Sequence, residues 1–122
     1  MVKRTKILVV YDEDSLRTLV KNELEERGFD IGEADCGETA LEKLGIERFD
    51  LVILDIGMPG MDGIGVLRKI RENNFADKVI MLTGVDELKI ARETLQLGAN
   101  DFLSKPFEFR SLIACIDRVL KE

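Results

Sequence analysis

The sequence predicts an α/β fold: a doubly wound parallel sheet of five strands in the flavodoxin-like order 2-1-3-4-5, covered by five helices. Two observations lead to it. Short apolar runs alternate five times with segments whose apolar residues recur with a period near 3.6. Three of the runs are apolar almost throughout, whereas two contain glycine, serine or acidic residues. Parallel strands buried on both faces read as continuous apolar runs, so the three lie inside the sheet.

The predicted strands span the chain from end to end. They are the runs at residues 6–10, 29–33, 50–54, 78–82 and 101–104. The second contains Gly32 and Glu33, and the fifth contains Asp101 and Ser104, so both are expected at the edges of the sheet. With right-handed crossovers, 2-1-3-4-5 is the simplest order that satisfies this placement.

Five amphipathic helices are predicted between and after the strands. Their apolar stripes are Leu16, Leu19, Val20 and Leu24; residues 39–44; Ile64, Leu67 and Ile70; Leu88, Ala91 and Leu95; and Leu112, Ile113, Ile116, Val119 and Leu120. The predicted N-caps are Asp14, Asp62, Asp86 and, in a capping box with Glu38, Asp35. Gly28 and Gly98 stand where two helices end, and glycine favours the left-handed conformation that such ends adopt.

Composition limits the chemistry. The 122 residues, with 24 acidic and 18 basic side chains and a net charge of -6, fit one domain, residues 1–122. This acidic excess argues against direct nucleic-acid binding, which needs a basic surface. The chain has no histidine, which excludes Ser-His-Asp and Cys-His catalysis and histidine-ligated zinc. Any reaction therefore depends on carboxylates, hydroxyls, amines, thiols or a bound metal.

The sequence also predicts a location. Cys36 and Cys115 form no CxxC motif and fit two unpaired cysteines in a reducing compartment. The apolar run that follows the basic start is too short for a secretory signal. No stretch approaches the roughly 18 apolar residues of a membrane span. We therefore expect a soluble, cytoplasmic protein that does not bind membranes.

Chemically active side chains follow four of the five predicted strands. Asp12 follows strand 1, Asp55 strand 3, Thr83 strand 4 and Lys105 strand 5. In open α/β sheets ligands bind beyond the carboxyl ends of the strands, at the switch point that lies here between strands 1 and 3. The topology therefore brings together two carboxylates, a hydroxyl and an ammonium group that are far apart in the sequence.

This set of groups fits phosphoryl transfer to a side chain. Facing carboxylates at Asp12 and Asp55 suit a hard cation in oxygen coordination, above all Mg²⁺. A carboxylate can attack phosphorus and form an aspartyl phosphate. Mg²⁺ and Lys105 would offset the repulsion between the two anions, and the Thr83 hydroxyl would donate to the phosphoryl oxygens.

Four segments carry a resemblance to a known family: residues 7–13, 54–63, 79–84 and 98–107. With its Asp-x-x-Met-Pro-x-Met-Asp-Gly string and its downstream Lys-Pro-Phe, the sequence resembles the receiver domain of two-component response regulators over essentially the whole chain. The resemblance implies that Asp55 is the phosphoacceptor and that Mg²⁺ binds Asp12, Asp55 and the backbone carbonyl of Gly57. It further implies that Thr83 is the switch hydroxyl and that Lys105 pairs with the phosphoryl group.

The resemblance also implies partners and a switching surface. The phosphoryl donor would be a histidine kinase or phosphotransfer protein. The phosphorylated domain would act on a downstream effector or on a covalently linked output domain. The domain would not be an enzyme beyond slow self-phosphorylation and self-dephosphorylation. Residues 58–60 would shape the loop beside the site, and the Lys105–Pro106 bond can be cis. The switching surface, on the fourth helix, fifth strand and fifth helix, would include Lys89, Arg92, Phe102 and Phe109.

Two positions depart from the family pattern. An acidic pair usually follows the first strand, and here its first member is Tyr11. One interpretation is that Mg²⁺ binds more weakly and the Tyr11 ring partly covers the site. The alternative is a pseudo-receiver, an interaction module with impaired metal binding and phosphorylation. Phe102 takes the place of a switch tyrosine, and its ring is either simply packed or able to rotate without a hydroxyl to bond.

Two other classes of protein share parts of this pattern. A haloacid-dehalogenase-like phosphatase would need a second aspartate two residues after Asp55, where Gly57 stands. A flavodoxin-like electron carrier would need a hydroxyl-rich phosphate loop after strand 1 and flanking aromatic residues, but the chain has no tryptophan and one tyrosine. Neither class fits as well as the receiver domain.

Overall fold

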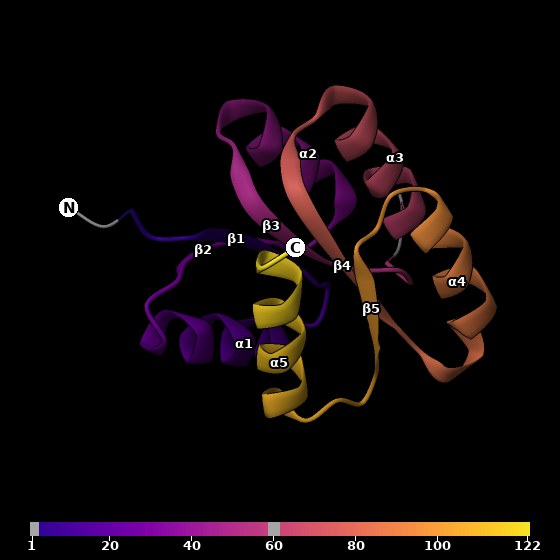
Figure 1. Ribbon diagram of the computed structural model, residues 1–122. Helices are drawn as coiled ribbons and strands as arrows, with labels where there is room; N and C mark the ends of the chain where they lie inside the picture. The colour runs from indigo at the N-terminus through magenta and orange to yellow at the C-terminus, as the bar shows by residue number, and fades with distance from the viewer. Residues whose placement is uncertain (1–2, 59–61) are drawn as a thin grey trace.

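The computed structural model describes residues 3–58 and 62–122. Five parallel strands form one sheet in the predicted order β2-β1-β3-β4-β5 (Figure 1). The strands are β1 (Lys6–Val10), β2 (Asp30–Ala34), β3 (Phe49–Asp55), β4 (Ala76–Thr83) and β5 (Asp101–Ser104). The helices are α1 (Asp14–Glu26), α2 (Gly37–Ile46), α3 (Gly63–Asn73), α4 (Leu88–Gln96) and α5 (Phe109–Leu120), and a short 3-10 turn, η1 (Val85–Glu87), precedes α4.

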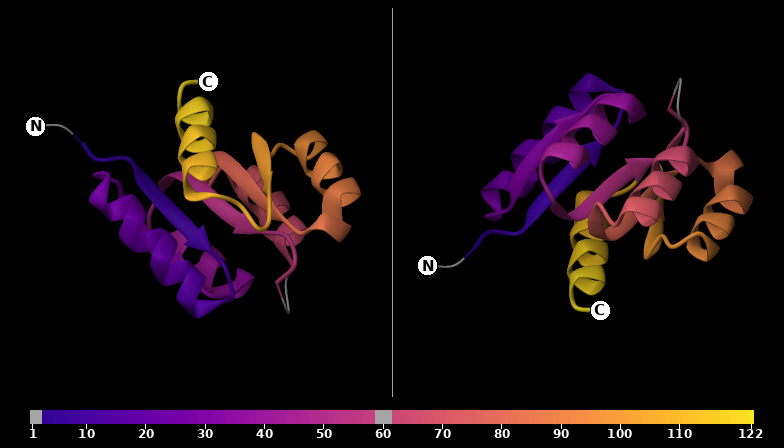
Figure 2. Two further views of the ribbon diagram at one scale, coloured as in Figure 1. Left: turned by 90° about the horizontal axis from the view of Figure 1, so that it is seen from below. Right: turned by 90° about the horizontal axis from the view of Figure 1, so that it is seen from above.

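The helices cover both faces of the sheet, and each face has its own apolar core. Helices α2, α3 and α4 pack on one face, and α1 and α5 on the other (Figure 2). On β3, Val52 and Leu54 face the first group of helices, whereas Leu51 and Ile53 face the second. These four side chains are fully buried, as the continuous apolar run predicted.

The helix ends follow the predicted signals only in part. Asp62 is the N-cap of α3, and its carboxylate accepts a hydrogen bond from the backbone of Gly65 at 2.9 Å. Gly28 and Gly98 have φ angles of +95° and +108°, as expected after α1 and α4. Each of these two helices ends in a Schellman pair of backbone hydrogen bonds. At the end of α1, the Phe29 amide donates to the Leu24 carbonyl and the Gly28 amide to the Glu25 carbonyl.

Three of the predicted N-caps are wrong. Glu13 precedes α1, so Asp14 is the first helical residue, and Cys36 rather than Asp35 precedes α2. Asp86 lies within η1, and Glu87 is the N-cap of α4. Capping preferences indicate where a helix begins to within a residue or two, but packing of the helix on the sheet decides the final boundary.

Two strands extend further than their apolar runs predicted, and this affects the site. β3 includes Asp55, which pairs with Leu82, and β4 includes Thr83, which pairs with Ser104. Asp55 and Thr83 are therefore final strand residues with backbones held by the sheet. Among the residues described, no helix is long and apolar enough to cross a membrane.

Candidate functional site

An ion pair between a buried carboxylate and a partly buried ammonium group lies at the carboxyl end of the sheet. Asp55 is 1% exposed, and its Oδ1 accepts a hydrogen bond from Nζ of Lys105 at 2.8 Å. The two residues are 50 positions apart in the sequence and meet because β3 and the segment after β5 end at the same edge. The peptide bond between Lys105 and Pro106 is cis. The structure thus brings together the predicted acceptor and the predicted lysine.

The backbone around Asp55 is held on both sides. The Ile56 amide donates to the Leu82 carbonyl at 3.0 Å, and the Gly57 amide lies 3.4 Å from Asp55 Oδ1. The start of α3 also approaches closely, since a Cβ on Gly63 would lie 2.5 Å from the backbone oxygen of Asp55. Only glycine permits this contact, so the loop after Asp55 requires Gly63 at this position.

The pKa of Lys105 reflects its position. Partial burial by itself lowers the pKa, but the hydrogen bond and the negative charge of Asp55 outweigh it, and the pKa is raised above its ordinary value. Lys105 is therefore an ammonium ion throughout the neutral range. A fixed positive charge next to a buried carboxylate is what an incoming phosphoryl anion requires.

Tyr11 is part of the same site. It follows β1, is 7% exposed, and its ring centre lies 5.2 Å from Nζ of Lys105, within the range of a cation–π contact. Arg17 donates to the Tyr11 carbonyl at 2.7 Å and holds this segment in place. Burial raises the pKa of the Tyr11 hydroxyl, while Lys105 lowers it, and the net shift is upward. The ring thus lies against the ammonium group, consistent with the expectation that it covers part of the site.

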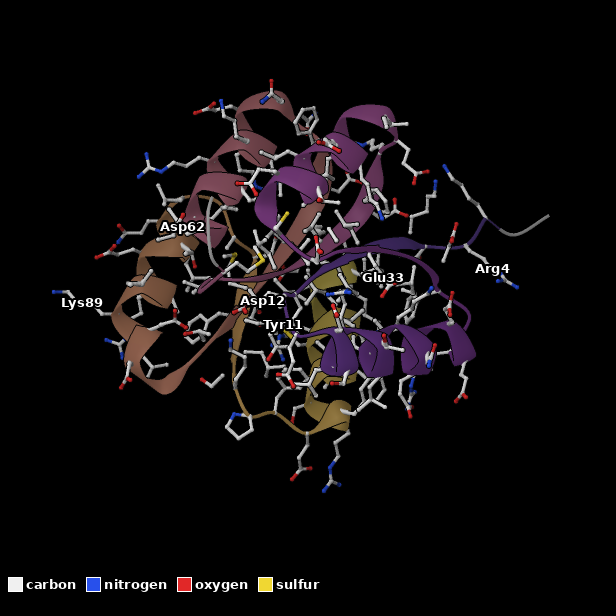
Figure 3. The ribbon with its side chains drawn as sticks, turned by 180° about the vertical axis from the view of Figure 1, so that it is seen from behind. Arg4, Tyr11, Asp12, Glu33, Asp62 and Lys89 are labelled. Atoms are coloured by element: carbon white, nitrogen blue, oxygen red, sulfur yellow. The ribbon has the colours of Figure 1, made fainter. Side chains whose placement is uncertain are left out.

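Asp12 lies beside Tyr11 at the mouth of the site (Figure 3). It is exposed, and the pairing of Val10 with Leu54 places Tyr11 level with Asp55 and Asp12 one residue beyond. Within residues 3–58 and 62–122, no three acidic, cysteine or histidine side chains are grouped closely enough to hold a metal. Two carboxylates and a backbone carbonyl still fit Mg²⁺, which usually binds one or two protein carboxylates and keeps water or phosphate oxygens as its other ligands.

Thr83 is buried, and its hydroxyl forms a hydrogen bond within its own loop. Its side chain is fully inaccessible, and its hydroxyl donates to the backbone carbonyl of Gly84 at 3.0 Å. The hydroxyl therefore has a local partner that it must leave if it is to bond a phosphoryl oxygen. Met58 is 4% exposed, whereas Pro59 and Gly60, also predicted to shape the loop, lie outside the described residues.

Glu87 is a site residue that the sequence did not reveal. Its Oε1 accepts a hydrogen bond from the Gly84 amide at 2.7 Å, and its Oε2 would lie 2.7 Å from a Cβ on Gly57. Its charge also contributes to the raised pKa of Lys105. The one signal in the sequence was the spacing, a glutamate three residues after Gly84 and at the start of a helix.

The residues of the predicted switching surface are divided between two places. Lys89 is exposed and points away from α4 at the periphery of the molecule (Figure 3). Arg92 is exposed on the same helix, and Phe102 is half-buried against the core beneath α2, α3 and α4. Phe109 instead packs towards α1, with the Arg27 guanidinium 5.7 Å from its ring centre. Phe109 therefore does not belong to one surface with Lys89 and Arg92.

An apolar groove adjoins the ion pair. It has a volume of about 400 Å³ between α1 and the segment that follows β5. Its lining consists of Tyr11, Leu16, Leu19, Val20, Lys105, Pro106, Phe107 and Phe109. Leu16 and Leu19, neighbours on α1, are 39% and 54% exposed, so two large apolar side chains of the groove are open to solvent. The groove thus offers an apolar face beside Lys105.

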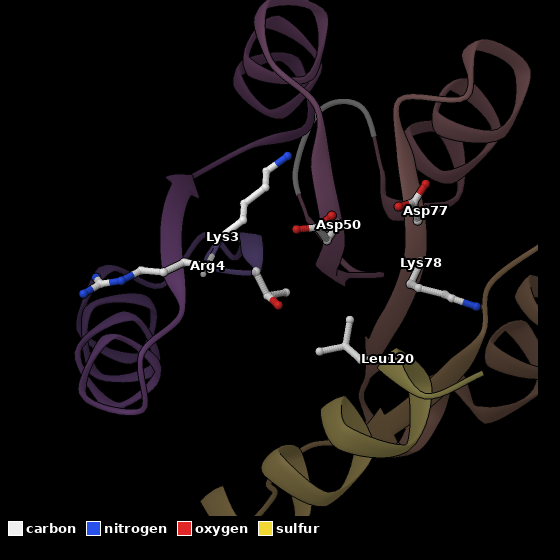
Figure 4. A pocket seen from close by; sticks show the side chains of 7 residues that line it. Lys3, Arg4, Asp50, Asp77, Lys78 and Leu120 are labelled. Carbon is white, nitrogen blue, oxygen red and sulfur yellow. The ribbon is translucent and has the colours of Figure 1, made fainter. Parts of the chain in front are cut away.

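A second cavity lies at the opposite end of the strands. It has a volume of about 350 Å³ and a mixed-charge lining that includes Lys3, Arg4, Asp50, Asp77 and Lys78 (Figure 4). Asp50 accepts a hydrogen bond from the Lys6 amide at 2.8 Å, and Asp77 forms an ion pair with Arg48. These carboxylates stabilise the amino ends of the strands and are remote from Asp55.

The fold and the site define a class: a doubly wound α/β domain with a buried aspartate–lysine pair at the carboxyl ends of its strands. The chain belongs to the response regulator receiver domain family, whose model matches residues 7–117. It is 40% identical over 116 residues to the alkaline phosphatase synthesis transcriptional regulatory protein PhoP of Bacillus subtilis. It is 41% identical over 118 residues to the transcriptional regulatory protein ResD of the same organism.

The relatives differ in length. The alignments cover 95% and 96% of this chain but 48% of PhoP and of ResD, so the chain spans about half the length of these relatives. Among solved structures, the receiver domain of the Francisella response regulator 1452 superposes with a TM-score of 0.88 at 32% identity, covering 97% of this chain and 98% of that one. Chemotaxis protein CheY4 of Vibrio cholerae gives 0.89 at 31% identity, with 96% and 99% covered. The chain is thus a two-component receiver domain with the CheY-like fold.

Proposed function

We propose that this receiver domain accepts a phosphoryl group on Asp55 from the phosphohistidine of a partner protein and thereby switches a protein-interaction surface. The observation that carries the proposal is the buried Asp55–Lys105 pair at 2.8 Å. A carboxylate that is almost inaccessible to water and held beside an ammonium ion is oriented for nucleophilic attack on an anion. The experiment that tests it is transfer of phosphate from acetyl phosphate to the protein, with Asp55→Asn as the control.

The transfer is a displacement at phosphorus. An oxygen of the Asp55 carboxylate forms the new P–O bond as the P–N bond to the donor imidazole breaks, and that imidazole keeps the electron pair. Lys105 balances the charge that develops on the phosphoryl oxygens, and the Thr83 hydroxyl donates to one of them after leaving the Gly84 carbonyl. Asp12, Asp55 and the Gly57 carbonyl would hold Mg²⁺, which would supply further positive charge near the phosphoryl oxygens.

The apolar groove is the docking position that we assign to the donor. A phosphohistidine must come within bonding distance of Asp55, so its carrier has to touch the surface around the acceptor. The groove begins at Lys105 and Tyr11 and continues along Leu16 and Leu19 on α1. An amphipathic helix that carries the phosphohistidine would bury both leucines, as helices do in apolar grooves.

Leu19→Glu tests this docking position. We expect at least about a tenfold slower transfer from a histidine kinase that phosphorylates the wild type, because central apolar contacts of an interface contribute most of its affinity. Phosphorylation by acetyl phosphate should not change, since Leu19 is 54% exposed and does not touch the acceptor. Leu95→Glu makes the same change at a 41% exposed position on α4 and should leave both rates unchanged. Equal rates for the wild type and Leu19→Glu with the kinase would place the donor elsewhere.

We propose that Tyr11 weakens the binding of Mg²⁺ at this site. Tyr11→Asp restores the usual acidic pair, and we expect it to raise the affinity for Mg²⁺ about tenfold, the lower end of what an outer-sphere ligand contributes. The measurement is a calorimetric or NMR titration with Mg²⁺ of the wild type and the variant. Equal affinities would contradict the weakening by Tyr11, and no binding by the wild type would favour the pseudo-receiver.

The output of the switch lies on α4 and β5 in this proposal. The addition of a phosphoryl group draws Thr83 and the turn before α4 towards Asp55, and this displaces Lys89, Arg92 and Phe102 relative to the sheet. PhoP and ResD are transcriptional regulators that extend beyond the matched region. We therefore propose that a downstream protein or a linked output domain recognises this surface, and that the whole reaction takes place in the cytoplasm.

A further inference from the structure

The carboxylate of Glu87 lies among the groups that face the acceptor. Its Oε1 accepts from the Gly84 amide at 2.7 Å, and its other oxygen is directed at Gly57. A Cβ on Gly57 would lie 2.7 Å from Oε2, and a Cβ on Gly84 would lie 3.1 Å from Oε1. The two glycines therefore leave the space that this carboxylate fills.

The groups around Glu87 form an anion-binding position. The backbone amide of Gly84 and the backbone beside Gly57 contact this carboxylate, and its charge interacts electrostatically with the ammonium of Lys105. The Gly57 amide and Lys105 also contact Asp55 Oδ1, at 3.4 and 2.8 Å. A phosphoryl group bonded to Asp55 would place its oxygens close to Lys105 and the Gly57 amide, beside the backbone that Glu87 contacts.

From this arrangement we infer that Glu87 occupies, in the unphosphorylated protein, the position that the phosphoryl oxygens take, so that it competes with the phosphoryl group and has to leave when Asp55 is phosphorylated. The inference rests on the proposed function of Asp55. A carboxylate and a phosphoryl dianion cannot both bond the Gly84 amide, which has one hydrogen, and two anions so close together repel each other. Departure of Glu87 also frees the first residues of α4, which links the chemistry to the helix of the switching surface.

A simpler role for Glu87 is capping of the turn before α4. A neutral glutamine of the same shape keeps a side-chain oxygen that can accept from the Gly84 amide, so capping alone predicts little effect of Glu87→Gln. Competition with a phosphoryl anion depends on the negative charge of Glu87, so competition predicts that Glu87→Gln changes the affinity for a phosphoryl analogue. The variant therefore separates the two roles.

The experiment measures the affinity for beryllofluoride with Mg²⁺, followed by amide chemical shifts, for the wild type, Glu87→Gln and Asp86→Asn. Asp86 is an exposed carboxylate in the same turn and serves as the matched control. We expect Glu87→Gln to bind about tenfold more tightly, within the usual range of coupling between two competing ligands. Asp86→Asn should stay within about twofold of the wild type, the residual effect of an exposed charge screened by solvent.

Three results would overturn the inference. Equal or weaker binding by Glu87→Gln would show that its carboxylate does not compete. An equal gain in Glu87→Gln and Asp86→Asn would show a general effect of charge. Failure of all three proteins to bind beryllofluoride or to be phosphorylated by acetyl phosphate would reject the proposed function of Asp55, and the competition with it, whereas the first two results leave that function intact.

Discussion

Asp55→Asn is expected to abolish the incorporation of acid-labile phosphate. The amide has the shape of the carboxylate and keeps an oxygen for Lys105, but it is too weak a nucleophile to attack phosphorus. The measurement is the mass gain of one phosphoryl group after incubation with acetyl phosphate and Mg²⁺. The mass of the wild type should increase by one phosphoryl group and the mass of the variant should not. EDTA during the incubation should prevent the increase in the wild type.

Asp62→Asn is the matched control for this loss. Asp62 is the N-cap of α3, seven residues beyond the acceptor, and asparagine caps a helix as well as aspartate does. The control should fold and incorporate phosphate as the wild type does. Persistent incorporation by Asp55→Asn, with the control unaffected, would move the acceptor to another carboxylate of the chain.

Lys105→Ala is expected to slow phosphorylation by acetyl phosphate by about 100-fold, the effect typical of removing one preorganised donor from a developing negative charge. The ammonium group lies 2.8 Å from the acceptor oxygen, and Mg²⁺ alone would then have to offset the repulsion between two anions. The measurement is the rate of phosphate incorporation at a fixed concentration of acetyl phosphate and saturating Mg²⁺.

Lys105→Arg separates charge from geometry. The guanidinium keeps the positive charge but is broad and planar, and the space between Asp55 and the Tyr11 ring, whose centre lies 5.2 Å from Nζ, is fitted to an ammonium group. Its rate should fall between those of the wild type and Lys105→Ala. A rate for Lys105→Ala within threefold of the wild type would show that the ion pair is structural and not part of the transfer.

The fold was predictable because the sequences of the strands show which of them are buried on both faces. The runs at β1, β3 and β4 are apolar at nearly every position, and this pattern is compatible only with strands covered on both faces. The polar ends of these strands were less predictable. Asp55 and Thr83 continue the hydrogen bonding of β3 and β4 beyond the apolar residues, and an apolar pattern does not reveal such an extension.

The site was predictable to the extent that strand ends determine it. Asp55 and Lys105 had to converge once the strand order was known, and they do. The contact of Glu87 with Gly57 was not predictable, because it depends on how two loops that follow different strands approach each other. The left-handed C-cap of α3 was missed for a related reason: Asn74 takes a φ of +53°, and asparagine is a weaker signal for this conformation than glycine.

The position of Tyr11 shows what the structure adds to the sequence. From the sequence, its main consequence was one carboxylate fewer near the metal. In the structure, its ring also lies against Lys105 and lines the groove beside α1. Tyr11 therefore connects the acceptor with the surface on which we place the donor.

Localisation of the phosphoryl group tests most directly whether Asp55 is the phosphoacceptor. The phosphorylated wild type is reduced with borohydride, which converts an aspartyl phosphate to homoserine, and the peptides are sequenced by tandem mass spectrometry. We expect homoserine at position 55 alone, and only when Mg²⁺ is present during phosphorylation. Homoserine at Asp12 or at another aspartate, or phosphate that survives acid and yields no homoserine, would contradict it.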